Sequence, residues 1–101
     1  MQNIFKEIEE ERRRQDDRFG EQNHKDGTSE KWIAQATLVR RENDLITSSK
    51  YKDITWQNIL DEEICEAFAE TDQTRMREEL IQCAAVIVAW LESVDRRPKD
   101  V

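Results

Sequence analysis

The chain has 101 residues, of which 39% are charged and 37% hydrophobic, and its formal net charge at pH 7 is −7. This length fits a single domain, residues 1–101, near the lower limit for a chain that builds its own core. The negative charge argues against nucleic-acid binding, which normally needs a cationic face against the phosphates.

Four helical segments and no convincing strand can be predicted, so the expected fold is all-α. The first helix runs from about residue 3 to residue 18, and Gly20 ends it. The next segment, residues 21–29, is rich in turn-forming residues and contains the only histidine, His24. Ser29 is a plausible N-cap for the second helix, whose apolar positions continue to Ile46.

The last two helices are expected to form a hairpin over about residues 54–97, which is the core of the domain. The third helix can begin at Asp53 or Thr55, and the fourth ends near Arg97 because Pro98 cannot continue it. The connection at residues 71–74 is short, so the two helices should be antiparallel neighbours.

Residues 83–91 form an unbroken apolar run. The run is far too short to span a bilayer, and flanking charge excludes a signal peptide, so no membrane partner is expected. It is typical of a helix buried on all sides, which a small monomer can rarely supply. We therefore expect a homo-oligomer, either a dimer or a tetramer.

The two cysteines, Cys65 and Cys83, form no CxxC or Cys/His pattern, so zinc binding has little support. Both lie in apolar helical segments, where free buried thiols are the commoner state, although two cysteines leave a disulfide open. Free thiols suit a reducing cytoplasm.

Several carboxylates occupy positions where an amphipathic helix normally places apolar residues. On the third helix, Glu63 and Glu70 fall within the apolar arc and Glu66 lies on its edge. On the fourth helix, Glu79 shares a stripe with apolar residues. A carboxylate that faces a packed interior costs several kcal/mol unless something compensates it.

Compensation can come from an arginine, from proton uptake or from a metal ion. An internal salt-bridge network is the structural alternative, with Arg40, Arg41, Arg75 and Arg77 as its candidates. Three glutamates on adjoining helical faces favour a divalent cation instead, because their mutual repulsion makes one ion the simplest neutraliser. Oxygen-only ligands indicate Mg²⁺, with Mn²⁺ as the other option.

The stretch DEEICEAFAETDQTRMREELIQCAAVIVAW, residues 61–90, resembles the core of the MazG-like all-α nucleoside triphosphate pyrophosphohydrolases. That family carries Glu-x-x-Glu on one helix and Glu-x-x-Asp on the next. Glu63 and Glu66 match the first motif and Glu79 the start of the second, while Gln82 stands where the family has aspartate. The segment FGEQNH, residues 19–24, is similar to a loop of MazG domains, and the whole chain resembles short MazG-like proteins of actinobacteria and their phages.

The resemblance implies an oligomeric four-helix bundle in a bacterial or phage-infected cytoplasm. It implies Mg²⁺-dependent hydrolysis of a (d)NTP to (d)NMP and pyrophosphate. Glu63, Glu66 and Glu79 would be the metal ligands, and Gln82 would occupy the fourth position with a neutral oxygen. Glu63, deepest in the apolar arc, is the expected catalytic base.

The base and sugar of the nucleotide need partners outside the carboxylates. The candidate substrate-binding residues are Asn23, His24, Asp26, Trp32 and Arg40. For His24 the alternative is an exposed loop histidine, and for Trp32 a packing role. Two further functions stay open: a non-catalytic nucleotide-binding protein in which Gln82 marks lost activity, and a helical interaction protein whose glutamates are paired with arginines.

Overall fold

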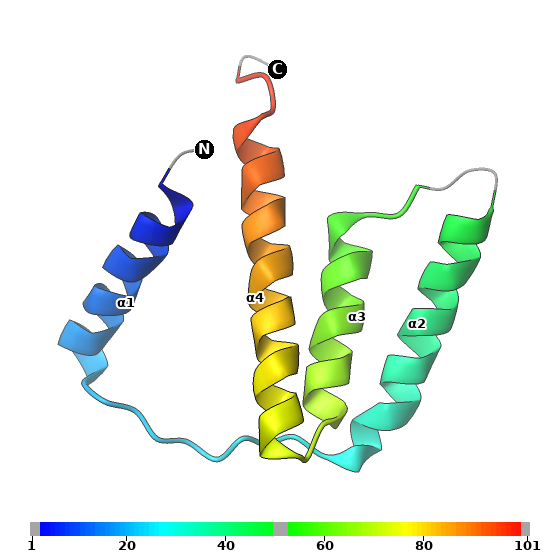
Figure 1. Ribbon diagram of the computed structural model, residues 1–101, viewed down its shortest axis with the longest axis horizontal. Helices are drawn as coiled ribbons and strands as arrows, with labels where there is room; N and C mark the ends of the chain where they lie inside the picture. Colours follow the sequence, from blue (N-terminus) through cyan, green and yellow to red (C-terminus); the bar gives the residue numbers. More distant parts are fainter. Residues whose placement is uncertain (1–2, 50–52, 100–101) are drawn as a thin grey trace.

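The computed structural model describes residues 3–49 and 53–99, and within these ranges every regular element is a helix (Figure 1). The elements are α1 (Ile4–Phe19), the short 3₁₀ helix η1 (Glu30–Trp32), α2 (Ile33–Ser48), α3 (Trp56–Ala69) and α4 (Gln73–Asp95). The prediction of an all-α fold is confirmed. No helix among the described residues is long and apolar enough to cross a membrane.

Side-chain caps mark the starts of η1, α3 and α4. The Ser29 hydroxyl accepts a hydrogen bond from the backbone N–H of Lys31 at 3.2 Å. Thr55 and Asn58 form a reciprocal capping box at the start of α3. Asp72 caps α4 by accepting from a backbone N–H three residues later, at 2.9 Å. These polar side chains satisfy N–H groups that have no partner within the helix.

Three details differ from the sequence-based expectation. Ser29 caps η1, so the second α-helix begins at Ile33. The fourth helix ends at Asp95, before the proline-restricted Arg97. Glu70 does not lie on the helical arc, because α3 ends at Ala69 and the Glu70 backbone is extended. The Glu70 carboxylate accepts instead from the next two backbone N–H groups, each at 3.1 Å.

The helices lie side by side in one layer, in the order α1, α4, α3, α2 (Figure 1). Helix α3 packs against both α2 and α4, whereas α1 contacts only α4 among the described elements. The molecule measures 48 × 44 × 19 Å, and its radius of gyration is 16.4 Å. A compact chain of this length has a radius of about 13 Å. The protomer is therefore flat and open.

The linker between α1 and η1 runs along one end of the layer (Figure 1). Gly20 and Gly27 both have positive φ, at 67° and 73°, a backbone conformation that residues with a Cβ rarely adopt. The backbone N–H of Ser29 donates to the carbonyl of Phe68 at 2.9 Å, which anchors the end of the linker to α3. The linker thus starts α2 beside the last turn of α3.

The core of the layer is small. Ala36, Val39 and Cys65 form its buried cluster between α2 and α3. Trp56 and Trp90 stack with their ring centroids 6.5 Å apart, which joins α3 to α4. Cys65 and Cys83 are buried and free, as predicted.

The apolar run of α4 is not buried on all sides within one chain. One stripe of this helix is exposed along its whole length: Leu80, Ala84, Ile87, Leu91 and Val94. Their spacings of four, three, four and three residues match the seam of a coiled coil. One face of the run packs against α3, whereas the stripe is left exposed by the helices of the described residues.

Candidate metal centre

Helices α3 and α4 bring three glutamates together. Glu63 and Glu66 lie one turn apart on α3, and Glu79 lies on α4. One carboxylate oxygen of each lies within 4.8 Å of the others. Within the described residues, this glutamate cluster is the one group of three or more acidic, His or Cys side chains placed to share an ion.

Two oxygens of the glutamate cluster are buried without a hydrogen-bond partner among the described residues. They are Oε2 of Glu63 and Oε2 of Glu79. Burial raises the pKa of both carboxyl groups, and the charge of Glu66 raises each pKa further. An unpartnered buried carboxylate oxygen is a costly arrangement that a cation would relieve. The donor set therefore fits a hard divalent ion such as Mg²⁺ or Mn²⁺.

Glu66 differs from the other two glutamates because an arginine pairs with it. Arg40 on α2 donates to Glu66 Oε1 from Nη2 at 2.6 Å and from Nε at 3.2 Å. This contact raises the pKa of Arg40, chiefly through the hydrogen bond. The salt-bridge alternative thus accounts for one of the three glutamates, and among the described residues Glu63 and Glu79 have no ion pair of their own.

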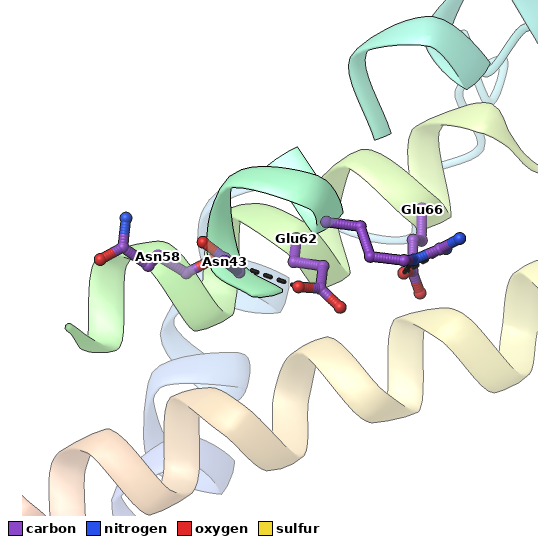
Figure 2. Close-up of polar contacts among 5 residues, drawn as sticks. Asn43, Asn58, Glu62 and Glu66 are labelled. Atoms are coloured by element: carbon purple, nitrogen blue, oxygen red, sulfur yellow. Dashed lines mark hydrogen bonds and ion pairs between the residues drawn. The ribbon is translucent and has the colours of Figure 1, made fainter. Parts of the chain in front are cut away.

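A second polar contact from α2 was not anticipated from the sequence. Asn43 is 4% exposed, and its amide donates to the Asn58 carbonyl and to Glu62 Oε1, each at 2.9 Å. Figure 2 shows Asn43 against Glu62, with Glu66 one turn further along α3. The signal was present, because Asn43 continues the buried 3–4 spacing of Ala36 and Val39.

A pocket of about 220 Å³ opens where α2, α3 and α4 meet. Arg40, Glu66 and Glu79 contribute its charged wall, together with Glu70 from the connection. Thr37 and small or apolar side chains of α2 and α3 line the rest. Two members of the glutamate cluster therefore face a space that a ligand can enter.

The predicted substrate-binding residues are not all gathered at this pocket. Arg40 lines it, but Asn23, His24 and Asp26 lie exposed in the linker. Asn23 donates to Glu21 at 2.9 Å, and His24 Nε2 lies 3.0 Å from Gln22 Oε1, so both contacts are local.

Trp32 and Gln82 are also not among the residues that line this pocket. Trp32 is half-buried and packs edge-on against Phe68, with ring centroids 5.1 Å apart, as a packing residue would. Gln82 lies on α4 one turn after Glu79 and is exposed.

The two free thiols lie close to the acidic residues. Burial raises the pKa of Cys83, and the charges of Glu63 and Glu79 raise it further. Burial and the neighbouring Asp61 raise the pKa of Cys65. Both thiols are thus held in the neutral form, which suits packing better than metal ligation.

Comparison of the chain with protein-family models, with curated proteins and with solved structures finds no match in any of the three. What the site can do chemically therefore follows from its own residues.

Proposed function

We propose that the protein is a Mg²⁺-dependent nucleoside triphosphate pyrophosphohydrolase of the MazG-like type. The observation that carries the proposal is the glutamate cluster, with its oxygens within 4.8 Å and two of them buried without a partner. The adjoining pocket supports it, because Arg40 of α2 lines this pocket together with Glu66 and Glu79. In such a site Glu63, Glu66 and Glu79 hold the ion, with Mn²⁺ as a substitute for Mg²⁺.

When bound, the ion supplies charge neutralisation and polarises the phosphate for attack by water. The chain's own residues then have separable tasks. Glu63 is the proposed general base, because its Oε2 is buried without a hydrogen-bond partner among the described residues and is available to accept a proton. Arg40 faces the pocket with a guanidinium suited to phosphate oxygens. The products are a nucleoside monophosphate and pyrophosphate.

A second candidate function is nucleotide binding without turnover. The observation that favours it is Gln82, which offers a neutral oxygen where the MazG-like pattern has a carboxylate and which is exposed on α4. A protein of this kind would sequester or sense a nucleotide. The third alternative, a helical interaction protein, is favoured by the Arg40–Glu66 pair alone.

Release of pyrophosphate from a panel of NTPs and dNTPs, with Mg²⁺ or Mn²⁺, tests the proposal. We expect turnover that requires the cation and falls at least about 100-fold in Glu63→Ala, as for loss of a general base. Glu42→Ala, which removes an exposed glutamate of α2, is the matched control and should retain activity. Thermal stabilisation by a nucleotide with Mg²⁺, but no pyrophosphate, would select the binding function. If the protein shows neither pyrophosphate release nor thermal stabilisation, only the helical interaction protein remains.

We further propose that the protein is a homo-oligomer in which the exposed stripe of α4 packs against a second copy. The stripe consists of Leu80, Ala84, Ile87, Leu91 and Val94. An exposed apolar seam with heptad spacing is the pattern that pairs helices in coiled coils and bundles. The flat, open protomer supports this, because a partner copy can close the layer into a bundle.

A further inference from the structure

We propose that Arg40 is an exchangeable counterion. It neutralises Glu66 while the glutamate cluster holds no cation, and it moves to a phosphate oxygen when a cation-bound polyphosphate enters the pocket. This inference rests on the proposed function and concerns the regulation of the same site. Its consequence is that the site disfavours the cation alone and favours the cation together with its phosphate ligand.

The geometry of the ion pair suits an exchange. Two of the guanidinium nitrogens of Arg40, Nη2 and Nε, donate to the same oxygen, Glu66 Oε1. A paired arginine and carboxylate more often align two nitrogens with two oxygens, which is the stronger arrangement. The Arg40 side chain is 53% exposed and that of Glu66 is 19% exposed. Arg40 is therefore the partner that can leave, while Glu66 stays in the layer.

The charge of Arg40 acts on the whole cluster. The Arg40 guanidinium lies 2.6 Å from Glu66, and carboxylate oxygens of Glu66, Glu63 and Glu79 lie within 4.8 Å of one another. A divalent cation bound between the three carboxylates would also neutralise them, with twice the charge of Arg40. The Arg40 guanidinium and the bound ion repel each other at such a short distance, so they compete for Glu66.

The pocket gives Arg40 a second destination. Arg40 on α2 and Glu66 and Glu79 on the opposing helices line the same space of about 220 Å³. A polyphosphate drawn into this space by the cation brings several negative oxygens toward the α2 wall. The guanidinium fork binds phosphate oxygens well, and this contact replaces the one that Arg40 gives up.

The exchange predicts effects of opposite sign for one substitution. In Arg40→Gln, Mg²⁺ alone should bind roughly fivefold to tenfold tighter, because a competing positive charge is gone. The preformed Mg²⁺–pyrophosphate complex should bind roughly tenfold weaker, because a phosphate ligand is gone. A residue that only stabilised the fold would weaken both.

Calorimetric titration of the full chain with MgCl₂, and separately with Mg²⁺–pyrophosphate, measures both affinities. Arg41→Gln is the matched control, since it removes the same charge from the neighbouring, exposed position and should leave both affinities unchanged. Arg40→Lys keeps the charge without the fork, so Mg²⁺ alone should bind as in the wild type and Mg²⁺–pyrophosphate more weakly. Helix content measured by circular dichroism verifies that each variant is folded.

The outcomes separate this inference from the function on which it rests. If the wild type binds Mg²⁺ and Mg²⁺–pyrophosphate but Arg40→Gln changes both affinities in the same direction, or neither, the exchange is wrong and the metal site stands. Equal gains in Mg²⁺ affinity in Arg40→Lys and Arg40→Gln would also overturn it, because charge would not be the cause. If wild type and variants bind neither ligand, the proposed function and the exchange fail together.

Discussion

Glu79 shows how one buried carboxylate couples stability to pH. Its pKa is raised by burial and by the charge of Glu66, so the folded chain binds a proton more strongly than the unfolded chain does. Without divalent cations, this group therefore destabilises the fold at neutral pH. Its penalty disappears as the pH falls through the raised pKa toward the ordinary value for glutamate.

Glu79→Gln should make the metal-free protein more stable at pH 7, by about 1 kcal/mol, near the lower end of the penalty for an unpartnered buried polar group. The gain should shrink as the pH falls below the ordinary pKa of glutamate, because Glu79 then becomes protonated in both states. Urea denaturation at a series of pH values in EDTA measures this difference. Glu42→Gln, at an exposed position of α2, should show a much smaller change at every pH. A gain that grew as the pH fell would contradict the raised pKa.

The positions of single glutamates could be predicted from the sequence, but their partners could not. Helical periodicity was enough to identify Glu63 and Glu79 as acids facing inward, and both have buried oxygens without partners. It could not pair Glu66 with Arg40, because a wheel describes one helix and not its neighbour. The spacing of Asn43 does indicate a buried position, but its partners lie on another element and could not be predicted for the same reason.

Between elements, Asn43 is a buried polar residue that joins α2 to α3, in addition to the more exposed Arg40–Glu66 pair. Its amide bridges the Asn58 carbonyl and the Glu62 carboxylate at a buried position (Figure 2). Asn43→Leu should lower the free energy of unfolding by about 2 kcal/mol, because the hydrogen bonds to the Asn58 carbonyl and to the charged Glu62 carboxylate are both lost. Chemical denaturation monitored by circular dichroism measures this loss.

Asp44→Ala on the same helix is the control for that measurement. Asp44 is exposed and follows Asn43 directly, so its removal should change stability by less than about 0.5 kcal/mol. Equal effects of the two substitutions would mean that the Asn43 contacts do not hold α2 in place.

The elements themselves were largely predictable because their starts depend on local chemistry. Ser29, Thr55 and Asp72 are capping residues whose hydrogen bonds stay within a few positions of the chain. The end of α3 was less predictable, since Glu70 is a good helix former that leaves the helix to bind the next backbone N–H groups.

For the whole molecule, the exposed stripe of α4 is the feature on which the proposed assembly rests. Ile87 lies at the middle of the stripe, so Ile87→Glu places a charge inside any interface built on it. We expect the wild type to sediment as a multiple of the 12.1 kDa chain and the variant to shift toward the monomer by at least tenfold in dissociation constant. Sedimentation velocity over a range of concentrations measures this shift.

Leu45→Glu provides the control, because Leu45 is more exposed, at 70%, but lies on α2, away from the stripe. It should leave the assembly unchanged. A wild-type protein that sediments as a single 12.1 kDa chain at all concentrations would show that α4 needs no partner copy.

The linker that carries α1 has a consequence for concentrated solutions. Since α1 contacts only α4 among the described elements, what keeps it on its own chain is mainly tethering. A short linker keeps the attached segment near its binding site at an effective concentration on the order of millimolar. In micromolar protein, a chain's own α1 therefore outcompetes the α1 of a separate molecule by about a thousandfold. As the protein approaches millimolar concentration this advantage vanishes, and exchange of α1 between molecules becomes the expected outcome.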